Sequence, residues 1–100
     1  MTTAAKLAQR SPEGTAAHDQ LARALVALAA QGERPRCGDS ATHRLWTSDS
    51  PEDRQLAATW CNGCLVLTEC GTAAEATGER FGVWGGVDRS PRQQQRRTAA

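Results

Sequence analysis

Four cysteines constrain this chain more than any other feature of its sequence. Three of them lie in the stretch from Trp60 to Cys70, which reads W-C-N-G-C-L-V-L-T-E-C. Cys61 and Cys64 form a C-x2-C knuckle, and Cys70 follows after five more residues. The fourth, Cys37, is separated from the knuckle by 23 residues. No cysteine is left over, so the four thiols are enough to complete one tetrahedral-sulfur centre.

The supply of large apolar side chains is too small for an ordinary hydrophobic core. Leu, Val, Phe and Ile together make up 13 of the 100 residues, below the roughly 20% under which chains tend toward disorder. The net charge is only +1, so the chain is not a highly charged disordered segment. One hundred residues make at most one domain, and a domain with so little core usually needs a metal or disulfides. The cysteines are the candidates for that role.

Charge is distributed unevenly along the chain. The net charge is +2 over residues 1–36, −4 over residues 37–86 and +3 over residues 87–100. An acidic body with a basic tail indicates two surfaces with different partners. No stretch approaches the ~20 apolar residues of a membrane span. The short apolar run at 24–30 extends an amphipathic helical pattern, so we expect a cytoplasmic protein rather than a secreted one.

Hydrophobic spacing and capping residues predict three helices. We expect them over residues 15–31, 51–60 and 65–77. In the second, Ser50 suits the N-cap and Pro51 the first turn, while Leu56 and Trp60 share one face. Between the first two helices, Trp46 is expected to cover the core or the cysteine centre.

The third predicted helix carries Cys70 on its buried side and ends at Gly78. Residues 82–86, G-V-W-G-G, are expected to form a turn, and four Val with no Ile leave little material for a sheet. The predicted fold is therefore all-α, a small bundle of about three to four short helices. We expect residues 1–14 to be disordered, residues 15–86 to form the helical domain, and residues 87–100 to form a flexible basic tail.

Spacing alone leaves two kinds of metal centre open. Zinc fits four thiolates in a closed tetrahedron, but four-cysteine zinc sites usually show two C-x2-C knuckles. Iron–sulfur proteins often take several ligands from one segment and one from far away, as here. Two disulfides are a weaker alternative. A thioredoxin-like redox site is weaker still, because it would require a βαβ context that this sequence lacks.

The chain resembles the WhiB-like family of actinobacteria and their phages in the order of its motifs. An isolated cysteine is followed by C-x2-C-x5-C, then by G-V-W-G-G about a dozen residues later, and then by a basic tail. The resemblance covers roughly Cys37 to Arg97. It implies a small helical transcription regulator that senses oxygen, nitric oxide or redox state and binds a [4Fe–4S] cluster. The implied cluster ligands are Cys37, Cys61, Cys64 and Cys70.

The resemblance also implies two partner surfaces, with a monomer expected when the cluster is bound. The first surface is the family's turn, which packs against the C-terminal, DNA-binding region of the primary sigma factor. It is matched here by Gly82, Val83, Trp84, Gly85 and Gly86. The second is the family's DNA-binding region, into which Arg89, Arg92, Arg96 and Arg97 fall.

The chain departs from the family pattern at three places. Leu65 stands where many members have a proline after the knuckle, and Leu45-Trp46 stands where many have two phenylalanines. These two changes still permit a cluster and a sigma contact. The tail lacks the Arg-Gly-Arg hook that some members place in the minor groove. We therefore expect the tail to make weak, salt-sensitive phosphate contacts instead.

Trp84 has two interpretations, which are compatible with each other. An exposed aromatic on a glycine turn suits a partner's pocket, whereas a tryptophan folded back over the cluster would exclude water.

No constellation of nucleophile, base or paired carboxylates argues for an enzyme. The alternatives to a regulator are a protein-disulfide reductase that uses Cys61 and Cys64 in the cluster-free form, or a zinc-binding interaction module.

Overall fold

The computed structural model describes residues 11–91, so the segment before residue 11 and the tail from residue 92 onward lie outside the described residues. The described part is mostly helical, as the sequence predicted. Its elements in chain order are α2 (Pro12–Ala30), the 3-10 helices η1 (Arg36–Gly38) and η2 (His43–Thr47), α3 (Pro51–Trp60), α4 (Leu67–Thr77), β1 (Val83–Trp84) and β2 (Val87–Asp88). Over residues 11–91, no helix is long and apolar enough to cross a membrane.

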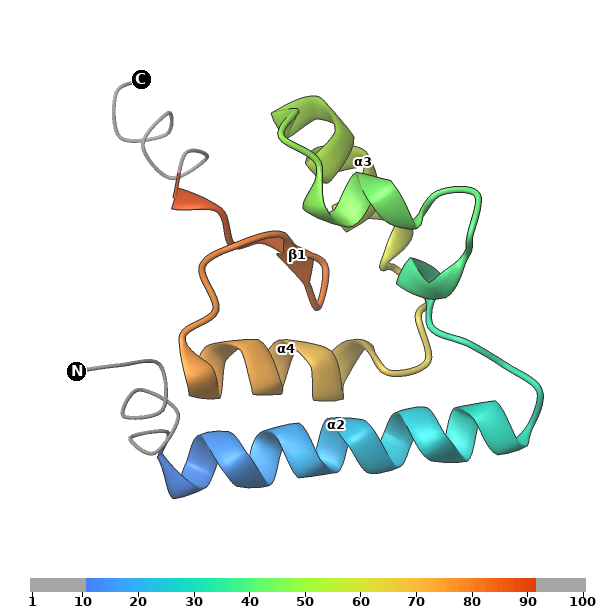
Figure 1. The fold of residues 1–100 in the computed structure, drawn as a ribbon, viewed down its shortest axis with the longest axis vertical. Coiled ribbons are helices and arrows are strands. Elements are labelled where there is room, and N and C mark those ends of the chain that lie inside the picture. Colours follow the sequence, from blue (N-terminus) through green and yellow to red (C-terminus); the bar gives the residue numbers. More distant parts are fainter. Residues whose placement is uncertain (1–10, 92–100) are drawn as a thin grey trace.

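The elements stack in layers. Helices α2 and α4 lie side by side and run in opposite directions (Figure 1). The β1–β2 hairpin lies on the side of α4 that faces away from α2, and α3 lies beyond the hairpin. Both 3-10 helices lie in the connection from α2 to α3, and η2 packs against α3. The hairpin is therefore held between α3, which leads into the Cys61–Cys64 knuckle, and α4, which carries Cys70.

Helix α2 begins earlier than the sequence analysis predicted. Ser11 is the N-cap, and its Oγ accepts a hydrogen bond from the Gly14 N–H at 2.9 Å. The helix therefore includes residues 12–14, which were expected to be disordered. The signal is present in the sequence, because S-P-E at 11–13 repeats the S-P-E at 50–52 that caps α3. The helix ends at Ala30, one residue before the predicted end.

Helix α3 has the bounds predicted for it, but the face with the large apolar residues is the exposed one. The Ser50 Oγ accepts from the Asp53 N–H at 3.4 Å, and Pro51 occupies the first turn. Leu56 and Trp60 remain 44% and 36% exposed. The buried residues of α3 are instead Arg54 and Ala57.

Helix α4 begins at Leu67, two residues later than predicted. The backbone before it is still part of the knuckle turn, in which the Leu67 N–H donates to the Cys64 carbonyl at 3.2 Å. The helix ends at Gly78 as predicted, because Gly78 adopts a left-handed conformation with φ 66°. Ala73 and Ala74 are almost fully buried, and Cys70 is half-buried on the same helix.

The glycine-rich segment is a β-hairpin rather than a simple turn. β1 and β2 pair antiparallel, with Val83 opposite Asp88 and Trp84 opposite Val87. Gly85 and Gly86 form the two-residue connection with φ values of 60° and 82°. Two consecutive residues with positive φ suit the tight hairpin turns that match strand twist. Each strand is only two residues long, which is consistent with the scarcity of sheet-forming residues.

Candidate metal centre

All four cysteines border one cavity, although they come from three separate segments. Cys37 lies in η1, Cys61 and Cys64 lie in the turn that follows α3, and Cys70 lies in α4. The other residues around the cavity are mostly apolar. They are Pro35, Arg36, Trp46, Val66, Leu67, Val83 and Gly85. The fold thus brings together the four predicted ligands and surrounds them with mostly apolar residues.

The knuckle is formed by a tight turn at the end of α3. The Cys61 N–H closes the helix by donating to the Ala57 carbonyl, and the Cys64 N–H donates to the Cys61 carbonyl at 2.9 Å. Gly63 has φ 84°, a conformation that a side-chain-bearing residue rarely adopts. This turn places the two knuckle cysteines on the same cavity.

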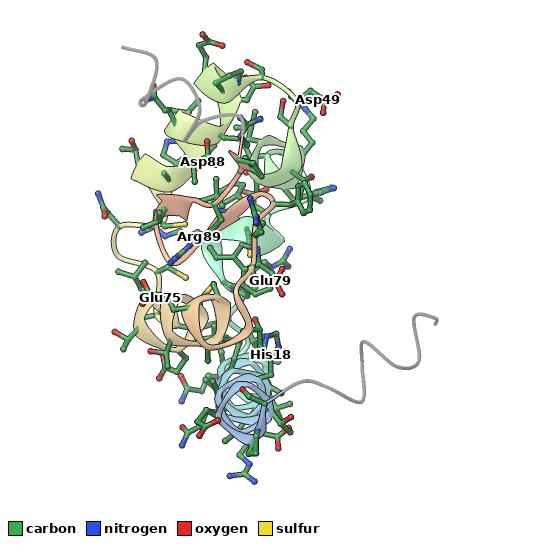
Figure 2. The ribbon with its side chains drawn as sticks, turned by 90° about the vertical axis from the view of Figure 1, so that its left-hand side faces the viewer. His18, Asp49, Glu75, Glu79, Asp88 and Arg89 are labelled. Atoms are coloured by element: carbon green, nitrogen blue, oxygen red, sulfur yellow. The ribbon has the colours of Figure 1, made fainter. Side chains whose placement is uncertain are left out.

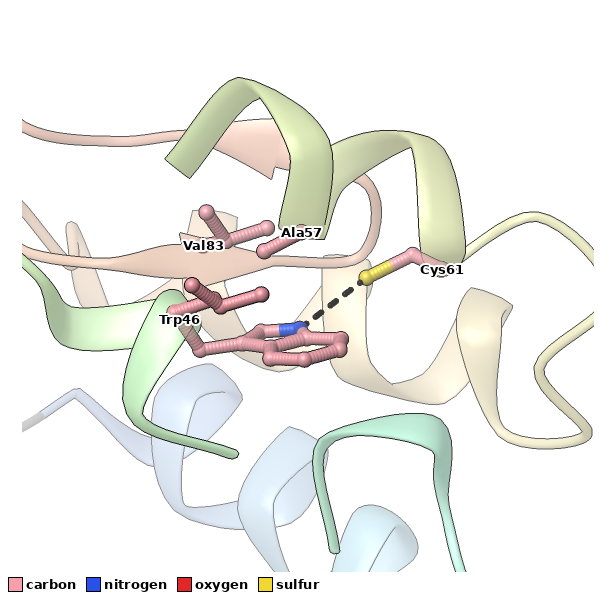
Figure 3. Close-up of a cluster of buried hydrophobic side chains, with 5 residues drawn as sticks. Trp46, Ala57, Cys61 and Val83 are labelled. Carbon is pink, nitrogen blue, oxygen red and sulfur yellow. Dashed lines mark hydrogen bonds between the residues drawn. The ribbon is translucent and has the colours of Figure 1, made fainter. Parts of the chain in front are cut away.

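Trp46 covers this centre, as the sequence predicted. It is 5% exposed, and its Nε1–H donates to the Cys61 sulfur at 3.3 Å (Figure 3). Ala57 and Val83 are buried in the same cluster. A hydrogen bond to a cluster-ligating sulfur is one of the features that tune iron–sulfur centres.

The four sulfurs are close enough to influence one another electrostatically. Burial raises the pKa of the Cys37 thiol, and the nearby sulfurs of Cys64 and Cys61 raise it further. Burial is also the main cause of the raised pKa of Cys70. The Gly85 backbone N–H acts in the opposite direction, and the other three cysteines raise the pKa further. Cationic iron bound here would reverse this preference for the protonated form, because metal ligation requires thiolates.

These four thiols are consistent with an iron–sulfur cluster, which takes thiolate ligands. All four are free cysteines, so no disulfide is present. Within residues 11–91, no group of three or more Cys, His, Asp or Glu side chains is placed to hold one metal ion. A zinc ion requires every sulfur about 2.3 Å from the same point. Cys37, Cys61, Cys64 and Cys70 would be the ligands of an iron–sulfur cluster bound in this cavity.

The hairpin packs directly onto the cysteine centre. A Cβ added at Gly85 would lie 2.5 Å from the Cα and 2.7 Å from the N of Gly71, the residue after Cys70. A Cβ added at Gly82 would lie 2.9 Å from the Trp46 carbonyl oxygen. These two glycines therefore allow the hairpin backbone to touch both α4 and η2. The family resemblance implies a partner role for these glycines, and the internal contacts with Gly71 and Trp46 are an additional role.

The hairpin residues predicted to bind a partner differ in accessibility. Gly82 and Val83 are buried, while Trp84, Gly85 and Gly86 are half-buried. Trp84 does not border the cysteine cavity. Its ring lies 6.1 Å from the His18 ring, and its Nε1–H donates to the Phe81 carbonyl at 3.1 Å. The reading in which Trp84 covers the cluster therefore does not describe this structure.

Arg89 is engaged inside the domain. Its Nε and Nη2 donate to the Trp84 carbonyl at 3.4 and 3.2 Å, and its Nη1 pairs with Glu75 at 3.4 Å (Figure 2). The Arg89 side chain is only 14% exposed, so it secures the hairpin to α4. The other three arginines of the predicted DNA-binding set, Arg92, Arg96 and Arg97, lie outside the described residues.

Comparison with known proteins gives a family match over most of this region. The family model described as "Transcription factor WhiB" matches residues 32–97. "Transcriptional regulator WhiB7" from Mycolicibacterium smegmatis is 43% identical over 42 residues, which are 42% of this chain and 41% of that protein. "Probable transcriptional regulator WhiB7" from Mycobacterium tuberculosis strain H37Rv is 40% identical over 42 residues, or 42% of this chain and 46% of that protein. The matched region is less than half of each relative, and no solved structure matches the chain.

Proposed function

Because the chain belongs to the WhiB family of transcription factors, we propose that it is a cytoplasmic transcription regulator built around one [4Fe–4S] cluster. The observation that carries this proposal is the convergence of Cys37, Cys61, Cys64 and Cys70 on one cavity. When bound, the cluster supplies one-electron chemistry and reactivity toward oxygen and nitric oxide. The reducing cytoplasm keeps thiols free for such a centre.

The chain's own residues protect one side of this centre and leave the other accessible. Trp46 and Val83 are 5% and 7% exposed and shield the cavity from the α3 side. Cys37, in η1, is the most exposed of the four cysteines. Small oxidants would therefore reach the cluster from the Cys37 side. We propose that their attack on the cluster is the signal to which the regulator responds.

The proposed partner is the C-terminal, DNA-binding region of a primary sigma factor, with DNA contacted second. Trp84 lies next to the exposed Phe81 and Val87, which are 75% and 44% exposed. A partially exposed aromatic with apolar neighbours is a suitable anchor for a protein partner. The hairpin leads directly to the basic tail, so docking would bring Arg92, Arg96 and Arg97 near DNA held by the sigma factor. Tethering raises the effective concentration of such weak contacts.

The cluster is tested on anaerobically purified protein by its visible spectrum and its iron and sulfide content. About four irons and four sulfides per chain, with broad visible absorption, are expected for a cubane. Stoichiometric zinc without visible absorption would replace this proposal with that of a zinc-binding interaction module. Following the cluster absorbance in air and in nitric oxide, beside sigma binding, tests the sensing role. If sigma binding were unchanged after complete cluster loss, the cluster would not be a sensor.

Sigma docking is tested with Trp84→Ala. Binding to the isolated sigma region should weaken by about 2 kcal/mol, or roughly 30-fold, if Trp84 is an energetic anchor. The cluster spectrum should be retained, because Trp84 does not border the cavity. Thr72→Ala, an exposed change on α4, is the matched control. Unchanged affinity of the Trp84 variant would exclude the hairpin as the main contact.

The tail is tested separately by replacing Arg92, Arg96 and Arg97 together with Gln. Sigma binding should be retained, while promoter engagement by the sigma complex should weaken and lose part of its salt dependence. Arg89 is left unchanged because its guanidinium is held within the domain. Tight binding of the isolated protein to promoter DNA at physiological salt would contradict this division of roles.

A further inference from the structure

Arg36 lies at the rim of the cysteine cavity, directly before Cys37. It is the first residue of η1 and borders the cavity together with the four cysteines. Its guanidinium reaches across to the knuckle between Cys61 and Cys64. A Cβ added at Gly63 would lie 3.1 Å from the Arg36 Nη2 and 3.9 Å from its Cζ. A positive charge therefore rests against the turn that presents two of the four sulfurs.

The charge of Arg36 is not neutralised in the way that the charges of two other arginines near the site are. Arg54 and Arg89 are both paired with carboxylates. Within residues 11–91, no carboxylate lies within ion-pair distance of Arg36. Its field at the knuckle is therefore not cancelled by an adjacent anion. Arg36 is an exposed residue, so water screens part of this field.

We propose that Arg36 raises the reduction potential of the cluster and thereby sets the redox range over which the regulator responds. This inference rests on the [4Fe–4S] cluster proposed above. The oxidised cluster with its four thiolates is an anion, and reduction adds one electron and one more negative charge without forming or breaking a bond. A fixed cation stabilises the more negative state more strongly. Net charge and solvent exposure around a cluster are known determinants of its potential.

Arg36 is a positioning residue for charge rather than a ligand, so its test is a potential. Cluster-loaded wild type, Arg36→Gln and Arg36→Lys are titrated anaerobically with dithionite while the visible absorbance and the paramagnetic signal of the reduced cluster are recorded. Arg34→Gln is the matched control. Arg34 lies two residues before Arg36 and does not border the cavity, so this substitution removes an equal charge away from the cavity wall.

Arg36→Gln should lower the midpoint potential so that, at a fixed potential, the ratio of reduced to oxidised cluster falls about threefold or more. This corresponds to roughly 30 mV for a one-electron couple. Arg36→Lys should keep most of the wild-type potential, and Arg34→Gln should change it much less. A potential in Arg36→Gln that equals that of Arg34→Gln would overturn the proposal.

The iron and sulfide content separates this inference from the proposed function. Wild-type protein that assembles no cluster would refute the cluster itself. If Arg36→Gln loses the cluster while Arg36→Lys keeps it, the positive charge is required for cluster assembly rather than for setting the potential, and the proposal is rejected. If both variants lose the cluster while Arg34→Gln keeps it, Arg36 acts through its shape or packing and the proposal is rejected.

Discussion

Arg54 and Asp88 form a buried ion pair that ties α3 to the second strand of the hairpin. The Arg54 Nε donates to both carboxylate oxygens of Asp88, at 3.1 and 3.0 Å, and the two side chains are only 5% and 4% exposed. The Arg54 Nη1 also donates to the Ser48 carbonyl at 2.6 Å. Its Nη2 is buried and has no acceptor among the described residues. This pair fixes the hairpin, and therefore Val83 and Gly85, against the cysteine cavity.

Removal of one residue of the Arg54–Asp88 pair should destabilise the fold more than replacement of both residues by apolar ones. Asp88→Ala is expected to lower the free energy of unfolding by about 3 kcal/mol or more, because it leaves a buried guanidinium without its counter-charge. The double change Arg54→Met with Asp88→Leu should be less destabilising than Asp88→Ala alone. Urea unfolding of cluster-loaded protein, followed by circular dichroism, measures both.

The control for this experiment is Glu75→Gln, which removes the partner of Arg89. The Glu75 side chain is 73% exposed, so its ion pair is expected to contribute only about 0–1 kcal/mol. If Asp88→Ala and Glu75→Gln lowered the free energy of unfolding equally, the buried Arg54–Asp88 pair would be no more important for stability than the exposed Arg89–Glu75 pair.

Gly85 and Gly71 lie in close contact, but substitution by alanine should change the stability of the protein differently at the two positions. A Cβ at Gly85 would meet the Gly71 backbone at 2.5 Å, and Gly85 has φ 60°. Gly85→Ala should therefore cost about 3 kcal/mol through overpacking and left-handed strain. A Cβ at Gly71 has its nearest neighbours at 3.8 and 3.9 Å. Gly71→Ala should be neutral or slightly stabilising, because alanine is favoured within a helix.

Thermal unfolding of the two glycine variants, loaded with cluster under anaerobic conditions, distinguishes these outcomes. Iron retention provides a second measurement, because the Gly85 backbone borders the cavity. A Gly85→Ala protein as stable as Gly71→Ala would show that the hairpin does not lie this close to α4 in solution.

Trp46→Phe should leave the cluster in place but shorten its lifetime in air. Phenylalanine keeps an aromatic ring in the core but loses the N–H that donates to the Cys61 sulfur at 3.3 Å. Loss of a hydrogen bond to a ligating sulfur, together with a smaller cover, should make oxidation faster. The measurement is the rate of absorbance loss after exposure to oxygen.

Trp60→Phe is the matched control for this change. The Trp60 ring lies 6.2 Å from the Trp46 ring, but Trp60 is 36% exposed and does not border the cavity. Its replacement should leave the bleaching rate close to that of the wild type. Similar rates for both variants and the wild type would show that the Trp46 hydrogen bond does not protect the cluster.

Cys70→Ala should remove the cluster and much of the helical signal together. The chain has few large apolar residues, so the binding energy of the cluster is expected to contribute strongly to folding. Far-ultraviolet circular dichroism and iron content, measured on the same sample, test this coupling. A cluster-free protein that unfolds in a sharp, cooperative thermal transition would contradict it.

Much of the local structure was determined by the sequence itself. Ser50 and Pro51 specified the start of α3, and Gly78 specified the end of α4, because capping depends on residues within one turn of the helix end. The same rule applies to Ser11, Pro12 and Glu13, whose S-P-E sequence begins α2 in the way that the second S-P-E begins α3. The number and spacing of the cysteines likewise predicted a four-sulfur centre, which the convergence of these residues on one cavity supports.

Only the tertiary structure decided which faces are buried and which groups meet. Helical spacing places Leu56 and Trp60 on one face of α3, but α3 buries Arg54 because Asp88, 34 residues later, supplies a counter-charge. The contact of Gly85 with Gly71 and the approach of Arg36 to Gly63 also join separate segments. Local sequence rules describe neighbours along the chain, whereas burial and close contact depend on residues that folding brings together.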